Sequence, residues 1–140
     1  MKMVNKPVYI AASLLAILSV VAITSSGNLS VFAQSPDVQV SIVPGASTLA
    51  ETAWSPNPVE VSVGQKIVWT NNDATGHTVT SGSPGSPDVG KLFDTGFVKS
   101  ATGPGMLNKG MTFEYTPTAA GEIPYHCSLH PTMVGSIVVK

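Results

Sequence analysis

The sequence predicts an all-β protein, an antiparallel β-sandwich of about seven or eight short strands. Three observations favour this fold. Runs of β-branched residues alternate between apolar and polar positions, and Gly, Pro, Asn and Ser separate these runs. No stretch after residue 33 places apolar residues at i, i+3, i+4 and i+7 over three turns. Short strands with frequent turn residues and without a long helix are typical of β-sandwiches.

The predicted strands follow the chain in order. Residues 38–43 alternate at period two, and so do residues 59–63. The run 66–70 follows the second of these after only Gly64 and Gln65, and a two-residue link is typical of a tight hairpin. The remaining candidate strands are residues 78–80, 111–116, 123–127 and 136–140.

Between the strands at 78–80 and 111–116, residues 81–110 form the least regular part of the chain. This segment holds seven glycines and three prolines. A loop of that length without any regular element is uncommon in a small domain. We therefore expect residues 91–98 to form a short strand or a turn of helix within it.

Residues 1–33 have the layout of a secretory signal peptide. Lys2 and Lys6 precede an uncharged run over residues 8–23, and a small, polar stretch ends at Ala33. As a helix the run spans about 24 Å, less than the ~30 Å hydrocarbon core, which favours cleavage over an uncleaved anchor. We expect a leader at 1–33 and a working domain at 34–140, exported to the periplasm or cell surface. Any contact with a membrane would be made through a retained leader.

Composition excludes several classes of function. The chain has 140 residues and a formal net charge of -1, with seven Lys and no Arg. No basic run is present, so we expect no nucleic-acid partner. A single Cys excludes an internal disulfide framework and any zinc site that needs two cysteines. The leader holds two Lys and no acidic residue, so the domain that remains is mildly acidic.

The chemistry is concentrated near the C-terminus, where Cys127, His130 and Met133 are spaced at i, i+3 and i+6. Pro131 interrupts a regular helix, so we expect a compact loop between two strands with these side chains turned inward. Another donor must come from elsewhere, and His77 is the only His outside this segment. Two imidazoles, one thiolate and a weak thioether are the donor set of a trigonal copper site.

The other possible ligands are set aside. The side chain of His126 should point to the opposite face of its strand from Cys127, so we do not expect it to bind the same ion. Met106 and Met111 are assigned to packing or to the surface.

Residues 38–140 resemble the cupredoxins, the blue copper proteins of the plastocyanin and amicyanin type. The resemblance lies in the short Cys-x2-His-x2-Met loop, in Tyr125-His126-Cys127 and in the run 56–73 before the first His. It implies a Greek-key sandwich and one type 1 copper ion. The ligands that it implies are His77, Cys127, His130 and Met133.

Two positions depart from many cupredoxins. Gly76 precedes the first His in place of Pro, which implies a weak contact of its backbone carbonyl with copper on the side opposite Met133. Thr78 follows the first His in place of Asn. We expect the hydroxyl of Thr78 or of Ser128 to join the two ligand loops.

The first functional hypothesis is a single-electron carrier that cycles between Cu(II) and Cu(I) and is not an enzyme. Redox proteins that donate and accept the electron would dock transiently to a monomer near His130, on an apolar collar that includes Leu129, Pro131 and Gly76. One alternative is copper storage or delivery, although the Met-rich clusters typical of that role are absent from the sequence. The other is a subunit of a copper reductase, although three His in total leave no set for a catalytic site.

Overall fold

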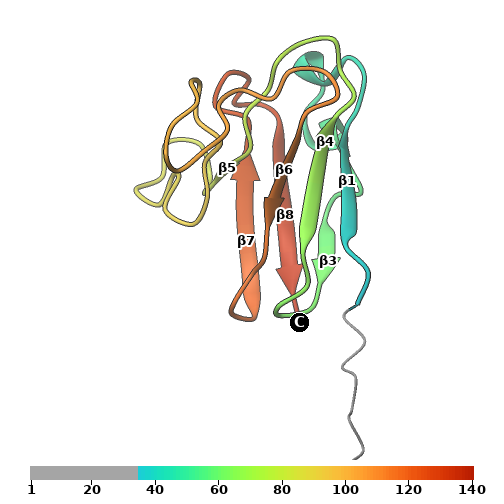
Figure 1. Ribbon diagram of the computed structural model, residues 1–140, viewed down its shortest axis with the longest axis vertical. Coiled ribbons are helices and arrows are strands. Elements are labelled where there is room, and N and C mark those ends of the chain that lie inside the picture. Colours follow the sequence, from blue (N-terminus) through green and yellow to red (C-terminus); the bar gives the residue numbers. More distant parts are fainter. Residues whose placement is uncertain (1–34) are drawn as a thin grey trace, which may run out of the picture. The chain divides into compact units, whose positions relative to one another are not determined.

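Two four-stranded sheets make up the computed structural model, which describes residues 35–140 (Figure 1). The predicted leader at 1–33 lies outside the described residues. In chain order the strands are β1 (Val38–Ile42), β2 (Trp54–Ser55), β3 (Val59–Val61), β4 (Ile67–Asn71), β5 (Thr80–Ser81), β6 (Thr112–Tyr115), β7 (Gly121–His126) and β8 (Val134–Val139). Two short 3-10 turns, Ala46–Thr48 and Glu51–Ala53, precede β2. Over residues 35–140, no helix has the length and apolar character needed to cross a membrane.

The strand order confirms the predicted sandwich. One sheet has the order β2-β1-β4-β6 and the other β3-β8-β7-β5. Each sheet contains one parallel pair, β1 with β4 and β3 with β8, beside its antiparallel pairs. The sheets are therefore mixed, because a strand that enters a sheet by crossing from the other one can run in either direction.

The predicted hairpin between residues 59–63 and 66–70 is wrong. The chain does turn here, with the amide of Gln65 donating to the carbonyl of Ser62 at 3.0 Å. However, β3 and β4 belong to different sheets, and each pairs with other strands. Val61 and Ile67 both enter the core, so the turn is an arch over the end of the sandwich.

Aromatic side chains fill the space between the sheets. Trp54 of β2 meets Tyr125 of β7 edge-on, with ring centroids 4.9 Å apart, and Trp69 of β4 meets the same ring at 5.6 Å. Such contacts contribute about 0.5–1.5 kcal/mol each beyond the burial of their surface. The core thus fixes β4 and β7, the strands that lead into the predicted ligand loops.

The expected strand or helical turn at residues 91–98 is also wrong. Apart from one isolated bridge between Asp94 and Thr80, this stretch has no regular structure. The amides of Leu92 and Phe93 instead donate to the Ser81 hydroxyl at 3.1 and 3.2 Å. The ring of Phe93 is buried 5.7 Å from that of Trp69. A side-chain acceptor and one aromatic anchor hold the long loop beside β5 (Figure 1).

Candidate metal centre

Two loops at one end of the sandwich carry the predicted ligands. His77 lies between β4 and β5 and exchanges two backbone hydrogen bonds with Leu107, at 3.1 and 2.8 Å. The other loop joins β7 to β8 and closes on itself. Within it the amide of Met133 donates to His130 at 2.8 Å, and the amide of Cys127 donates to Met133 at 3.1 Å. The predicted compact loop is confirmed.

Three donor atoms converge between these loops. Cys127 Sγ lies 3.8 Å from His77 Nδ1 and 3.8 Å from His130 Nδ1, and all three atoms lie within 4.8 Å of one another. A metal with bonds of about 2.0 Å to nitrogen and about 2.3 Å to sulfur, as zinc makes, would place these atoms about 3.7 Å apart in a trigonal plane. The spacing therefore fits a single first-row ion. Met133 is fully buried in the same loop.

The surroundings of Cys127 favour its thiolate. Burial opposes ionisation, but hydrogen bonds from the His77 ring, from the backbone amides of Thr78 and His130 and from the His130 ring outweigh it. Together they lower the pKa of the thiol from 9.0 to about 6. The thiolate is the form that binds metals.

A buried carboxylate that was not among the predicted site residues, Asp73, holds the other side of the His77 ring. Asp73 Oδ2 lies 2.8 Å from His77 Nε2. A carboxylate can only accept, so Nε2 carries a proton directed at Asp73 and Nδ1 faces Cys127. The sequence signal was an acidic residue four positions before the His.

Asp73 is itself fixed in place. Its Oδ1 accepts the amides of Gly45 and Ala74 at 2.9 and 2.8 Å. Hydrogen bonds from His77 and then from Gly45 outweigh burial and lower the pKa of Asp73 from 3.8 to about 2. Burial lowers the pKa of His77, but the contacts with Cys127 and Asp73 reverse that effect and raise it above its ordinary value.

The two ligand loops are joined as expected from Thr78 and Ser128. The amide of Ser128 donates to the hydroxyl of Thr78 at 2.7 Å. The amide of Thr78 points at Cys127 Sγ, 3.4 Å away. These contacts fix the thiol relative to the loop that carries His77.

Of the residues set aside in the sequence, His126 does not belong to the three-donor cluster. His126 Nδ1 is 2.7 Å from the carbonyl oxygen of Gly82, to which it donates. Met111 is partly exposed, and its sulfur accepts the amide of Asn108 at 3.4 Å. Met106 packs against the backbone of Gly76, where an added Cβ would lie 2.8 Å from its sulfur. The predicted contact between the Gly76 carbonyl and copper stays a prediction.

The end of the molecule that carries His130 has an apolar surface. His130 itself is half-buried. Leu129 is 42% exposed, and Pro131 is exposed beside it. These are two of the three residues assigned to the apolar collar, and the third, Gly76, is half-buried.

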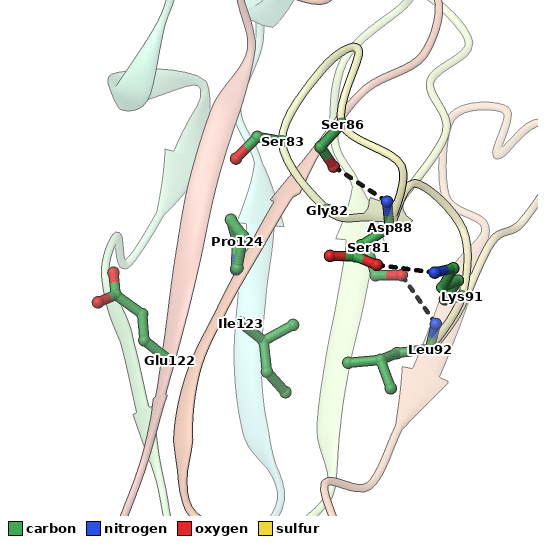
Figure 2. Close-up of a pocket in the computed structure, with 10 residues that line it drawn as sticks. All are labelled: Ser81, Gly82, Ser83, Ser86, Asp88, Lys91, Leu92, Glu122, Ile123 and Pro124. Carbon is green, nitrogen blue, oxygen red and sulfur yellow. Dashed lines mark hydrogen bonds and ion pairs between the residues drawn. The ribbon is translucent and has the colours of Figure 1, made fainter.

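A separate pocket of about 440 Å³ lies between β7 and the loop after β5 (Figure 2). Leu92, Ile123 and Pro124 form its apolar part, and an ion pair between Lys91 and Asp88, 2.8 Å long, lies at its side. None of the candidate ligands lines this pocket, so it is distinct from the metal centre.

Comparison with known proteins points to copper. The family model of copper-binding proteins, plastocyanin/azurin family, matches residues 42–140. Amicyanin from Paracoccus denitrificans is 30% identical over 111 residues, which cover 76% of this chain and 75% of the relative. Amicyanin-alpha from Methylorubrum extorquens is 27% identical over 129 residues, covering 92% and 95%. Among solved structures, a purple cupredoxin from Nitrosopumilus maritimus aligns with a TM-score of 0.62 and 30% identity, over 74% of this chain and all of that one.

Proposed function

The chain belongs to the plastocyanin/azurin family of copper-binding proteins, and from this premise we propose that one copper ion binds where the two ligand loops meet. The proposed ligands are His77, Cys127, His130 and Met133. The protein is a blue copper electron carrier and not an enzyme, as its amicyanin relatives indicate. The observation that carries the proposed ligand set is the convergence of one sulfur and two imidazole nitrogens within 4.8 Å.

The residues around the proposed site suit electron transfer because they resist movement. Bound copper supplies one-electron chemistry, with soft sulfur donors that favour Cu(I) and imidazoles that accept Cu(II). Cys127 and His77 have no exposed surface, so they exclude water. The His77 ring donates to Asp73 and the Thr78 amide donates to Cys127 Sγ, and these hydrogen bonds keep both ligand side chains in one position. A site with fixed donors changes little in shape when an electron arrives or leaves.

We assign electron entry and exit to the end of the molecule that carries His130. Redox proteins are the partners expected of this family. Among the three clustered donors, His130 is the one that is only half-buried. Leu129 and Pro131 beside it offer a small apolar surface, and transient redox complexes bury small areas. We propose that the protein is a monomer that docks through this collar.

We also propose that residues 1–33 direct export and that residues 34–140 form the copper domain. The charge pattern of residues 1–33 supports this proposal. Mass spectrometry of the protein from its native cells tests it. A chain that begins at Gln34 is expected, whereas the mass of the intact chain would indicate a retained anchor.

Rapid-mixing kinetics test the carrier role. The copper-loaded chain should accept one electron from a reductant and return it to an oxidant repeatedly, with the metal content unchanged. Copper that instead passes to a metal-free acceptor within one cycle would support storage or delivery, the alternative that the family relatives do not favour.

A further inference from the structure

We propose that Asp94 acts through the hydroxyls of Thr80 and Thr78 on the thiolate of Cys127 and thereby lowers the reduction potential of the bound copper. This inference rests on the proposed copper site and adds a positioning residue from the long loop after β5. We call the three polar side chains, Asp94, Thr80 and Thr78, the hydroxyl relay.

The relay runs from the surface to the ligand sulfur. Asp94 is exposed, and its Oδ1 lies 2.9 Å from the Thr80 hydroxyl. Thr80 Oγ1 lies 3.2 Å from Thr78 Oγ1, which in turn is 3.9 Å from Cys127 Sγ. Both threonines are fully buried. An uninterrupted line of polar atoms therefore joins a surface carboxylate to the thiol.

Asp94 is held in place although it faces solvent. The amide of Gly96 donates to the same Oδ1 at 2.9 Å. The backbone of Asp94 forms an isolated antiparallel bridge with Thr80. These two contacts keep the carboxylate of Asp94 directed at the Thr80 hydroxyl.

The number of hydroxyl protons fixes which group donates and which accepts in each hydrogen bond of the relay. A carboxylate only accepts hydrogen bonds, so Thr80 must donate its single hydroxyl proton to Asp94. Thr80 Oγ1 can then only accept from its two other neighbours, the hydroxyls of Thr78 and Ser128, the latter at 3.0 Å. The Thr78 proton is therefore drawn toward Thr80 and away from Cys127 Sγ.

The direction matters because hydrogen bonds to the ligand sulfur tune the potential of such sites. A donor at the sulfur withdraws charge from the thiolate, which weakens its donation to Cu(II) and raises the potential. While Asp94 holds the relay, the Thr78 hydroxyl does not act as that donor. The long loop supplies none of the proposed ligands, yet through Asp94 it affects the reduction potential of the copper.

Replacement of Thr80 tests the relay without a change of charge. Thr80→Val removes the acceptor for Thr78, so the Thr78 proton turns to Cys127 Sγ. The copper-loaded full chain should then show a higher reduction potential and a lower copper–sulfur stretching frequency in resonance Raman spectra. Thr80→Ser keeps the hydroxyl and should match the wild type in both. A folded Thr80→Val protein with unchanged potential and frequency overturns the proposal.

Two replacements of Asp94 separate the relay from simple electrostatics. Asp94→Asn removes the charge but keeps an oxygen that accepts from Thr80, whereas Asp94→Ala removes both. The relay predicts a larger rise in potential for Asp94→Ala, and equal rises would contradict it. Asp88→Asn removes a charge of the same loop that pairs with Lys91, and it should leave the copper–sulfur frequency unchanged.

A measurement on the metal-free chain separates this inference from the proposed function. Proton NMR should detect a slowly exchanging Thr80 hydroxyl proton directed at Asp94, and this signal should be lost in Asp94→Ala. Rapid exchange of that proton in the wild type overturns the relay whatever the metal does. A relay seen in the metal-free chain, together with copper that binds without the thiolate, would instead overturn the proposed site.

Discussion

At the scale of single residues, Cys127 acts as a thiolate because of its neighbours. Burial alone would raise the pKa of the thiol, yet hydrogen bonds from two imidazoles and two backbone amides bring it to about 6. His77 is in turn oriented by Asp73. The ligand set is therefore arranged before any metal arrives, and copper would replace the proton shared between sulfur and imidazole.

Titration of the metal-free protein checks this arrangement. The folded-state pKa lies below the ordinary value of 9.0. The stability that comes from this shift is therefore fully present above pH 9 and is lost as the pH falls through about 6. The ultraviolet absorbance of the thiolate should rise with a midpoint near pH 6, and Cys127→Ser should show no such rise. A midpoint near 9 would mean that the ring contacts do not act on the sulfur.

Asp73→Asn tests the carboxylate behind His77. The pKa of Asp73 falls from 3.8 to about 2, which corresponds to about 2 kcal/mol. Because the pKa is lowered, this stability is present above about pH 4 and is lost as the pH falls through 2. Urea unfolding of the metal-free chain at pH 7 should lose about 2 kcal/mol in the variant. The exposed control Asp88→Asn should lower the free energy of unfolding by less than about 0.5 kcal/mol. Equal losses in the two variants would show that Asp73 stabilises the fold no more than an exposed carboxylate does.

At the scale of elements, the pairing of β7 with β8 fixes the ligand loop. Tyr125 stands opposite Gly135 in this pair. A Cβ at Gly135 would lie 2.6 Å from the Tyr125 ring, which is wedged between Trp54 and Trp69. A rigid ring packed between two others has no room to move aside, so this strand pair leaves no space for a side chain at Gly135.

Gly135→Ala should therefore destabilise the metal-free protein by about 1–3 kcal/mol, the usual cost of overpacking. The matched control is Gly76→Ala, where the added methyl meets the flexible end of Met106 and should cost less. Chemical unfolding measures both variants. Similar costs would indicate that the Tyr125 ring is free to shift.

The strands and loops also show how much of the structure could be predicted from the sequence. Alternating residues identified most strands, and the chemistry of Cys127, His130 and His77 identified the cluster, because donor type is a property of the residue itself. The hairpin after Val63 failed since a local pattern does not identify the partner of a strand. Asp73 was missed because its burial comes from the packing of distant segments, among them the amide of Gly45.

At the scale of the whole molecule, the surface ion pairs of Lys66 and Lys140 lie away from the metal centre. Lys66 pairs with Asp37 and Glu114, at 3.6 and 3.2 Å. It directly precedes β4, and Lys140, which pairs with Glu60, directly follows β8. The ligand loops lie at the other ends of β4 and β8. The end that carries His130 is thus free of these ion pairs and suited to apolar docking.

Electron self-exchange between two copies tests this docking end without a known partner. Leu129→Glu places a charge on the collar of both copies, and like charges that meet in an interface cost several kcal/mol. NMR line broadening in mixtures of oxidised and reduced protein measures the self-exchange rate. The rate of Leu129→Glu should be at least about tenfold lower than that of the wild type. Val63→Glu, at a 47% exposed position beside Lys140, should leave the rate unchanged. Equal slowing by both variants would place docking elsewhere.

The visible absorption spectrum of the copper-loaded chain tests the central claim most directly. A thiolate bound to Cu(II) should give an intense charge-transfer band that reduction abolishes. Cys127→Ser should bind copper, if at all, without that band. Wild-type protein that holds one equivalent of Cu(II) and yet lacks the band would contradict the claim that Cys127, His77 and His130 form a copper electron-transfer site.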